Sequence, residues 1–270
     1  MIKIISIEHE SAELIELQYR SFKKNMLEDF EFILIDNAQI TGNTRVSSDF
    51  SKLAERCQLT HIPVDFDESL VEEFDTCEDS VIRKFKVFSG SNYSTGAIAN
   101  SYALQWTQKN LIAKSSDPIC LIHSDIFMIR PDNLSQYLTE SDVIYYPQGP
   151  ADVNYIWPFF VLLSSTAPNR DSIKWWCGSV NNTPVDCGGM SYYFLNSSES
   201  LRKNHLHSSY IQDDPNLHFH PSDYEIFSID STSPKSMIHY RSASNWNNRS
   251  SDYHSAKKHW IQNLVHNGSQ

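Results

Sequence analysis

A histidine and an aspartate stand two residues apart after a short apolar run, and both side chains can bind a divalent metal ion. The segment reads Cys120-Leu121-Ile122-His123-Ser124-Asp125. Its apolar residues predict a buried strand, so the first polar side chains emerge where the strand leaves the core. Because strand side chains alternate between faces, we expect His123 and Asp125 to project to the same side. The plain alternative is a turn at the strand end, in which Asp125 only caps the residues that follow.

Alternating strand and helix patterns position this motif. Strand-like runs at residues 3–7, 30–35, 60–64 and 119–122 alternate with helical patterns at 11–24, 50–57 and from 94 or 95 to 112. Such βα units form a mostly parallel sheet with helices on its faces, and ligands gather at the edge where the parallel strands end. The second half is less regular. It has a short helix over 132–138, with Pro131 where a first helical turn would accept it, strands at 143–146, 159–163 and 236–240, and helices at 190–195 and after 253. With no linker or repeat, we predict one α/β domain over residues 1–270.

Composition and charge exclude several classes of protein. The chain has 270 residues, 40% of them hydrophobic, which argues against intrinsic disorder, and its net charge of -11 leaves no positive field for nucleic acid or anionic lipid. No apolar run approaches the roughly 20 residues that span a bilayer, and no run of signal-peptide length begins the sequence. We therefore expect a cytoplasmic protein that is not an integral membrane protein and has no nucleic acid partner. The five scattered cysteines lack a C-x-x-C pair, which favours buried free thiols over a disulfide framework or a zinc site.

The βα units and the His-x-Asp motif together resemble the nucleotide-diphospho-sugar transferases of GT-A fold, whose D-x-D signature occupies this place. The resemblance covers most of the chain and is strongest over residues 1–130. It implies a GT-A-like, Rossmann-like sheet, with residues 1–130 as the nucleotide-binding half and residues 131–270 as an elaborated acceptor-binding half. In that family the signature carboxylates hold Mn2+ or Mg2+ against the sugar-nucleotide diphosphate. Carried over, Asp125 is the metal carboxylate and His123 replaces the first aspartate, a change that suits Mn2+ better than Mg2+.

The resemblance also gives roles to a late segment, Met237-Ile238-His239-Tyr240-Arg241-Ser242. In many of these enzymes a histidine on a late strand supplies a third metal contact, which implies that His239 joins His123 and Asp125. A carboxylate, an imidazole and two diphosphate oxygens make a reasonable shell for Mn2+, and the charge of Arg241 would offset the charge on the leaving nucleotide. The alternative is a core histidine with satisfied hydrogen bonds.

Polar residues at other strand ends, and at one helix start, are candidate contacts of the sugar-nucleotide donor. Asp36 follows the second strand, where the family places an acidic contact to the base or ribose, and a carboxylate accepts from hydroxyl or N–H groups. The helix start after residue 93 resembles the family's segment beneath the donor sugar, and helix N-termini favour anions. Turn formation alone also explains such residues. The predicted donor contacts are His9, Asp36, Asn37, Asn92, Thr95, Asn100, Ser124 and Ser242.

A paired-glycine segment, Val185-Asp186-Cys187-Gly188-Gly189, resembles the turn that lines the sugars in this family. Glycines let the backbone pass close to a ligand before a helix begins. Asp186 is then a candidate general base for the acceptor hydroxyl, or simply the cap of that helix. Three tryptophans are candidates for stacking on sugar faces, namely Trp157, Trp175 and Trp176, and the alternative is that they are core or rim residues.

Three rival interpretations stay open. Asp65-Phe66-Asp67 is a literal D-x-D within an acidic stretch. A candidate ligand set of a metallohydrolase is formed by His205-x-His207 and His218-x-His220 with Asp223, since alternate residues of one strand share a face and imidazoles bind zinc or iron. The alternative is a His-rich surface loop. A catalytically inactive module that binds sugar nucleotides or glycans would keep the same fold.

With the resemblance, the sequence predicts a glycosyltransferase that moves a sugar from a nucleotide-diphosphate sugar to a glycan or other hydroxyl acceptor, with Mn2+ or Mg2+ as cofactor. The catalytic residues in this interpretation are Asp186 and Arg241, and the metal ligands are His123, Asp125 and His239. It depends on the convergence of residues 123, 125 and 239 around one cation.

Overall fold

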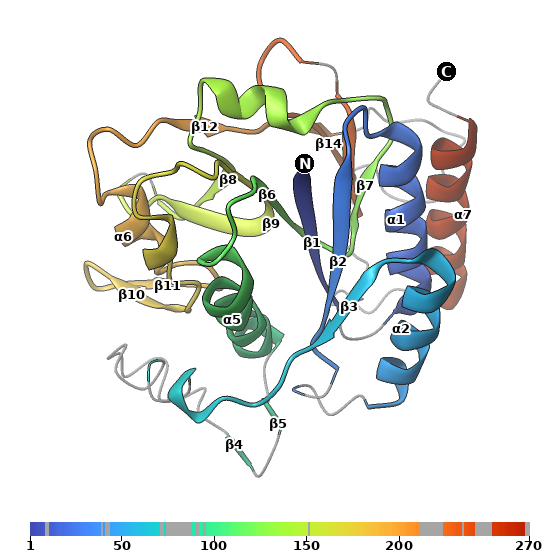
Figure 1. Cartoon of the computed structure of the whole chain (residues 1–270), viewed down its shortest axis with the longest axis horizontal. Coiled ribbons are helices and arrows are strands. Elements are labelled where there is room, and N and C mark those ends of the chain that lie inside the picture. The colour runs from blue at the N-terminus through green and yellow to red at the C-terminus, as the bar shows by residue number, and fades with distance from the viewer. Residues whose placement is uncertain are drawn as a thin grey trace.

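The computed structural model describes residues 1–8, 11–38, 40, 44–70, 73, 88–89, 92–93, 96–150, 152–210, 224–233, 235–240 and 250–267. Its centre is a seven-stranded sheet in the order β12-β8-β9-β6-β1-β2-β3 (Figure 1). Every strand of this sheet except β9 runs in the same direction. The predicted mostly parallel α/β sheet is therefore confirmed. The strands are β1 (Ile2–Glu8), β2 (Phe30–Asp36), β3 (Thr60–Pro63), β6 (Ile119–His123), β8 (Val143–Gln148), β9 (Tyr155–Leu163) and β12 (Lys203–His205).

Helices cover both faces of the sheet because the strands of its parallel half are apolar on both sides. On one face, Ile4 of β1 belongs to a core with Phe22 of α1 (Ala12–Asn25) and Phe50 of α2 (Thr44–Cys57). On the other face, Ile5 belongs to a core with Tyr102 of α5 (Gly96–Thr107), which continues as a π-helix over Gln108–Ile112. The last helix, α7 (Ser251–Asn267), packs on α1 (Figure 1).

A second sheet of four antiparallel strands adjoins the first, in the order β13-β14-β15-β7. Its strands are β7 (Ile126–Met128), β13 (His207–Tyr210), β14 (Tyr224–Ser228) and β15 (Met237–Tyr240). The chain leaves the main sheet after His123, turns through Ser124 and Asp125, and enters the second sheet as β7. This change of sheet fixes where the His-x-Asp motif lies.

Three elements differ from the sequence prediction. The helix expected over 132–138 is a 3-10 helix, Leu134–Thr139, and Pro131 precedes it because Asp132 instead forms a bridge with Met26. Strand β9 begins at Tyr155 rather than at 159, since a β-bulge opposite Tyr145 and Tyr146 accommodates Pro158. Helix α2 begins at Thr44, ahead of the expected residue 50.

Short elements complete the described structure. They are β4 (Phe88–Ser89), β5 (Asn92–Tyr93), a 3-10 turn (Arg170–Ser172), the hairpin of β10 (Gly178–Val180) and β11 (Thr183–Val185), and α6 (Ser191–Leu195). No helix in the described part of the chain has the length and apolar character to cross a membrane. Cys120 and Cys187 are buried free thiols, as predicted, whereas Cys57 and Cys177 are free thiols that are only partly buried. Cys77 lies outside the described residues.

Candidate functional site

Asp125 and His239 meet where β7 and β15 pair at the edge of the two sheets. Ile126 stands opposite His239 in this ladder, and the backbone N–H of Tyr240 donates to the carbonyl oxygen of Asp125 at 2.8 Å. The pairing places Nε2 of His239 3.4 Å from Oδ2 of Asp125. The structure thus brings together two of the three predicted metal ligands at the carboxyl end of the parallel strands.

The environment of His239 fixes its ring. His239 is buried and lies opposite Glu225 in the β14–β15 ladder, with its Nδ1 3.1 Å from Oε2 of that residue. Phe159 stacks on the imidazole at a centroid distance of 4.9 Å, and Trp157 meets it edge-on at 5.7 Å. Side chains of β9 and β14 therefore pack against the imidazole and give it a defined orientation.

The electrostatics of the pair favour opposite charges. Burial alone lowers the pKa of His239, but the carboxylates of Asp125 and Glu225 outweigh it, so the pKa is raised. Burial likewise raises the pKa of Asp125, and the attraction to His239 and His123 outweighs it, so this pKa is lowered. The other oxygen of Asp125, Oδ1, is buried and has no hydrogen-bond partner among the described residues.

His123 reaches the same region by a route that differs from the sequence argument. Strand β6 ends at His123, and Asp125 sits in the turn beyond it, so the expected alternation along one strand was wrong. The strand ends there because the next residues pair with β15 in the other sheet. Nε2 of His123 lies 3.1 Å from the side-chain nitrogen of Asn100 in α5, which joins a predicted donor contact to a predicted metal ligand.

Gln18 is a supporting residue that the sequence analysis missed. This fully buried side chain in α1 donates from Nε2 to the carbonyl oxygens of His123, at 2.6 Å, and of Ile126, at 2.8 Å. Its Oε1 accepts from the hydroxyl of Ser6 at 2.6 Å. Gln18 thus spans the turn that carries Asp125. The sequence signal that could have identified Gln18 is its place as a polar residue within the apolar stripe of the helix.

Asp36 and Asn37 are buried at the end of β2 and bond within the protein. The carboxylate of Asp36 accepts from the amide of Ala38 at 2.9 Å and from the hydroxyl of Ser47, and it lies 3.0 Å from Nε2 of His61. Burial raises the pKa of Asp36, but these hydrogen bonds outweigh it and lower the pKa. Asn37 donates to the carbonyl oxygen of Ala99 at 3.0 Å. Their roles toward a nucleotide stay predictions.

The Asp186 segment forms a tight turn beside β9. Asp186 is exposed and does not cap α6, since Met190 holds the N-cap position. Gly188 has φ +85°, and a Cβ there would lie 2.4 Å from the carbonyl oxygen of Ile156. The close approach that this glycine allows is therefore to the protein's own backbone, where we had expected a ligand. Burial raises the pKa of the Cys187 thiol, which interacts with Ser101 and Asn100 of α5.

Two of the three tryptophans are core residues. Trp175 and Trp176 are buried in the core beneath α5, so their predicted stacking on sugars was wrong. Trp157 is partly exposed and lies beside His239.

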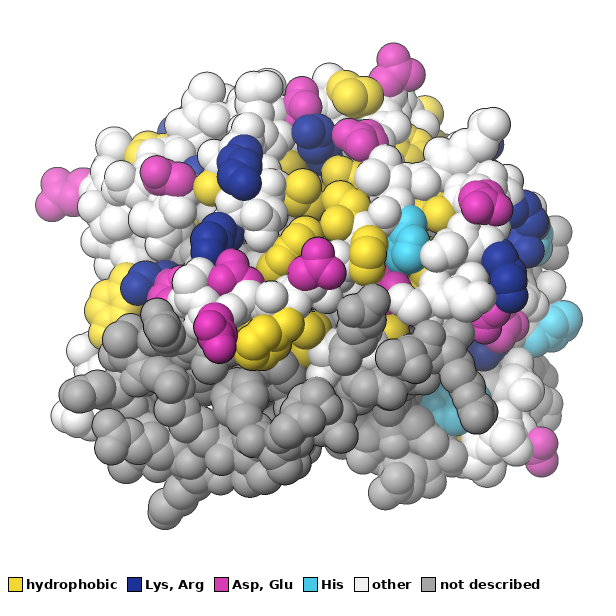
Figure 2. Space-filling model, turned by 60° about the horizontal axis from the view of Figure 1, so that its bottom comes forward, with side chains coloured by type: hydrophobic (Ala, Val, Ile, Leu, Met, Phe, Trp, Pro, Cys, Tyr) yellow, Lys and Arg dark blue, Asp and Glu magenta, His cyan; other side chains and the backbone are white. Residues whose placement is uncertain are grey.

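In Figure 2, where the carboxyl edge of the sheet comes forward, acidic side chains and a histidine lie among hydrophobic ones.

Several predicted residues cannot be placed. His9, Thr95, Arg241 and Ser242 lie outside the described residues, as do His218, His220 and Asp223 of the metallohydrolase interpretation. Only the backbone of Asn92 is described, in β5, and Ser124 lies in the turn after β6.

The rival metal motifs are engaged elsewhere or separated. Asp67 of the literal D-x-D accepts from Ser69 at 2.6 Å and pairs with Lys109 at 2.9 Å, and these contacts lower its pKa. His205 ends β12 in the main sheet, whereas His207 begins β13 in the second sheet. The two histidines therefore do not share the strand face that the metallohydrolase interpretation required.

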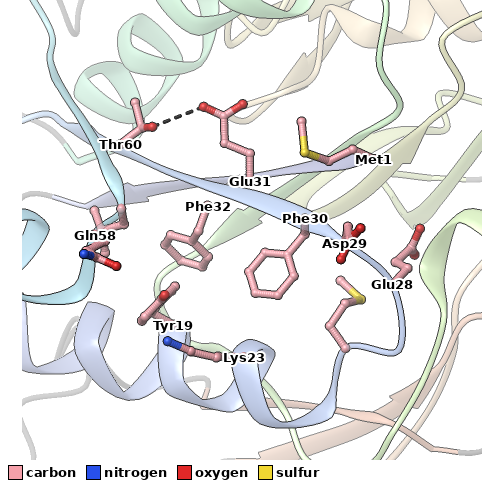
Figure 3. A pocket seen from close by; sticks show the side chains of 12 residues that line it. Met1, Tyr19, Lys23, Glu28, Asp29, Phe30, Glu31, Phe32, Gln58 and Thr60 are labelled. Atoms are coloured by element: carbon pink, nitrogen blue, oxygen red, sulfur yellow. Dashed lines mark hydrogen bonds between the residues drawn. The ribbon is translucent and has the colours of Figure 1, made fainter.

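A cavity of about 600 Å³ opens at the other end of the parallel strands (Figure 3). Figure 3 shows Tyr19 and Lys23 of α1 beside Phe30 and Phe32 of β2. Parallel sheets bind ligands at their carboxyl ends, and this cavity lies where β2 and β3 begin. It is separate from the candidate site.

The candidate site fits a divalent cation in part. Among the described residues, no group of three or more His, Cys, Asp or Glu side chains is arranged to hold a metal ion. Asp125 and His239 form a pair, and the buried Oδ1 of Asp125 is available as a further oxygen donor. A mixed nitrogen and oxygen donor pair suits Mn2+. Two protein ligands leave several coordination positions for a ligand such as a diphosphate.

No family model and no curated protein matches the sequence. Among solved structures, the chain is similar to the galactosyltransferase LgtC in complex with donor and acceptor sugar analogs, at 11% identity and a TM-score of 0.46, covering 100% of this chain and 97% of that one. The mostly parallel sheet with helices on both faces is the architecture that the sequence analysis expected. A mouse xyloside xylosyltransferase 1 in its apo form is also similar, at 10% identity and a TM-score of 0.40, covering 75% of this chain and 83% of that one.

A third similar structure is the mannosyltransferase PcManGT from Pyrobaculum calidifontis in complex with GDP-Man and Mn2+, at 10% identity and a TM-score of 0.40. The match covers 76% of this chain, which spans about half of the mannosyltransferase (54%). The Asp125–His239 pair lies at the carboxyl edge of the main sheet.

Proposed function

We propose that this protein is a glycosyltransferase that moves a sugar from a nucleotide-diphosphate sugar to an acceptor hydroxyl, assisted by a divalent metal ion. The observation that carries the proposal is the 3.4 Å approach of His239 to Asp125 at the carboxyl edge of the GT-A-like sheet. Ligands of open α/β sheets bind at this edge. His123 interacts electrostatically with Asp125, and Asn100 contacts His123, so both supply further polar groups.

The metal would be held by Asp125 and His239, with diphosphate oxygens in the remaining positions. When bound, a divalent cation offsets the negative charge on a leaving nucleoside diphosphate. The chain's own contribution is to hold one carboxylate and one imidazole in fixed positions before the donor binds. Mn2+ is the proposed ion because an imidazole takes part.

The other roles belong to the same proposal. Asp186 is the proposed general base, since it is exposed in a turn whose Cys187 reaches Asn100. Arg241 is proposed to offset charge on the leaving group. Asp36, Asn37 and Asn100 are proposed donor contacts, and the acceptor is proposed to be a glycan or another molecule with a free hydroxyl.

The test is a thermal-shift screen with UDP, GDP and their sugar conjugates, each with and without Mn2+. A ligand that binds only the folded state raises the melting temperature, and the stabilisation grows with the logarithm of its concentration divided by its dissociation constant. We expect one nucleoside diphosphate to stabilise the wild type only when Mn2+ is present, and Asp125→Asn to remove this dependence. Absence of any nucleotide response would contradict the proposal, and stabilisation by zinc alone would favour a metallohydrolase.

One observation favours a second candidate, a module that binds the donor without transferring its sugar. His123 stands where the resemblance expects a carboxylate, and its Nε2 contacts the side chain of Asn100. The same screen separates the candidates when each stabilising sugar nucleotide is then incubated with the enzyme. Release of free sugar or transfer to an added acceptor supports the enzyme, and binding without either supports the module.

A further inference from the structure

Glu225 is a buried carboxylate beside the candidate site that the proposed function leaves without a role. It stands directly opposite His239 in the β14–β15 ladder, and its Oε2 lies 3.1 Å from Nδ1 of that histidine. Glu225 is only 3% exposed. Burying a carboxylate is costly unless it is paired and hydrogen-bonded, so its contact with His239 is a substantial part of what stabilises it there.

The two ring nitrogens of His239 face two different carboxylates. Nδ1 faces Glu225, and Nε2 faces Oδ2 of Asp125 at 3.4 Å. An ionised carboxylate only accepts hydrogen bonds, so Glu225 requires the proton on Nδ1. In the neutral imidazole, Nε2 then carries the lone pair and points it toward Asp125.

A lone pair that faces a carboxylate oxygen is unfavourable unless a positive charge lies between them. The separation of 3.4 Å is longer than the roughly 2.7–2.9 Å of a charged N–H···O bond. It is close to the distance of about 3 Å between neighbouring ligand atoms around a cation with bonds of about 2.1 Å. The spacing therefore suits a metal ion that His239 and Asp125 share.

The aromatic neighbours of His239 do not set which way its nitrogens face, so the ring depends on Glu225 for that orientation. Phe159 stacks on the imidazole at an interplanar angle of 24°, and Trp157 meets its edge. These contacts hold the ring plane, but they do not distinguish its two nitrogens. The carboxylate of Glu225 does distinguish them, because only one nitrogen reaches it.

We infer that Glu225 is a positioning residue. It holds His239 in the Nδ1–H tautomer, so that Nε2 faces a metal ion shared with Asp125. This inference rests on the proposed metal-assisted function. A carboxylate behind a ligating histidine fixes the ring and raises its basicity, and loss of such a partner typically lowers metal affinity by about 10–100-fold. Glu225 acts only through His239.

The experiment measures Mn2+ binding by electron paramagnetic resonance, with Mn2+ alone and with Mn2+ plus UDP or GDP. The variants are Glu225→Gln, which keeps an acceptor oxygen but loses the charge, and Glu225→Leu, which loses both. We expect the dissociation constant for Mn2+ to rise by about 10–100-fold in Glu225→Leu and by less in Glu225→Gln. The control is Asn25→Leu, because Asn25 is equally buried but bonds to the carbonyl oxygens of Ser21 and Met128 in α1 and β7.

A second measurement on the same proteins reports the tautomer of His239 directly, by nitrogen-15 NMR of the histidine rings without metal and at a pH at which the ring is neutral. We expect Nδ1–H in the wild type and in Glu225→Gln, and a shift toward Nε2–H in Glu225→Leu. A wild type that binds Mn2+ and a Glu225→Leu variant that binds it within twofold would overturn the role of Glu225 alone. A wild type that binds no Mn2+ under any of these conditions would overturn the proposed function as well. If Glu225→Leu fails to fold, the Mn2+ affinity and the His239 tautomer of Glu225→Gln decide the question. A wild type whose His239 carries the proton on Nε2 overturns the inference.

Discussion

The side-chain amide of Gln18 donates to the carbonyl oxygen of His123 at 2.6 Å and so ties helix α1 to the turn that carries Asp125. The same nitrogen reaches the carbonyl oxygen of Ile126 on the far side of the turn, at 2.8 Å. One buried side chain therefore spans the point where the chain passes from the main sheet to the second sheet. The position of Asp125 depends on a helix that contributes no residue to the site.

Replacing Gln18 by leucine should loosen this turn. Two buried carbonyl oxygens would lose their donor, and we expect the free energy of unfolding to fall by about 2–3 kcal/mol. Because the turn holds Asp125, Mn2+-dependent nucleotide binding should weaken as well. Urea unfolding gives the first quantity, and the thermal-shift response to Mn2+ with nucleotide gives the second.

The matched control is again Asn25→Leu. Asn25 lies in the same helix and donates to the carbonyl oxygen of Met128 at 2.7 Å, farther along β7 from the turn. Its loss should destabilise the fold by a similar amount while leaving nucleotide binding by the folded protein unchanged. Equal losses of binding in both variants would mean that Gln18 acts only through global stability.

Replacing Asp125 by asparagine should abolish the metal dependence of nucleotide binding. The amide is a poor metal ligand, but its oxygen still accepts from a protonated Nε2 of His239, so the free energy of unfolding should change by only about 1 kcal/mol. Calorimetric titration of nucleotide with and without Mn2+ measures the effect.

Asp67→Asn tests the other D-x-D within the same experiment. Its carboxylate pairs with Lys109 at the surface, and such pairs contribute about 0–1 kcal/mol. This variant should bind Mn2+ and nucleotide as the wild type does. If it loses the metal dependence and Asp125→Asn keeps it, the metal site lies at residues 65–67.

The sequence predicted the elements whose signal is local. Strands β1, β2 and β6 are nearly continuous apolar runs, and α1 has both an apolar stripe and Ser11, whose hydroxyl caps it by accepting from the amide of Leu14. These features are set by residues close together in the chain. The pairing of Asp125 with His239 was also expected, but only through the family resemblance.

The missed features all depend on contacts between distant segments. The sheet change after His123 follows from the pairing of β7 with β15, which no local pattern encodes. Strand β14 contains the buried Glu225, a charged residue that sequence patterns assign to the surface. The bulge that admits Pro158 exists because β9 lies between β6 and β8. In each case tertiary pairing decided what the local sequence left open.

The hydrogen bonds of Asp36 predict a stability change in acid. Since its folded pKa lies below the unfolded value of 3.8, the ionised form is favoured by folding. The contribution is therefore complete well above pH 3.8 and is lost as the pH falls through the lower folded pKa. Asp36→Asn should reduce the free energy of unfolding at pH 7 by about 1.5–3 kcal/mol, and this difference from the wild type should shrink toward pH 3. Urea unfolding over this range measures both, and a constant difference would contradict the assigned hydrogen bonds.

Asp186 gives the sharpest test of sugar transfer as opposed to donor binding. Its carboxylate is exposed, its Oδ1 accepts only the neighbouring amide of Cys187 at 2.7 Å among the described contacts, and its own amide lies 3.3 Å from the hydroxyl of Tyr155. Asparagine preserves this geometry but cannot take a proton from an acceptor. General bases contribute about 10²–10⁴-fold to a rate. We therefore expect Asp186→Asn to lower kcat by that factor, with the dissociation constants of donor and Mn2+ unchanged.

The control is Asp152→Asn, which changes another exposed carboxylate before β9 and should leave kcat as it is. A kcat for Asp186→Asn within a fewfold of the wild type would leave Asp186 as a turn residue and assign proton removal to another group.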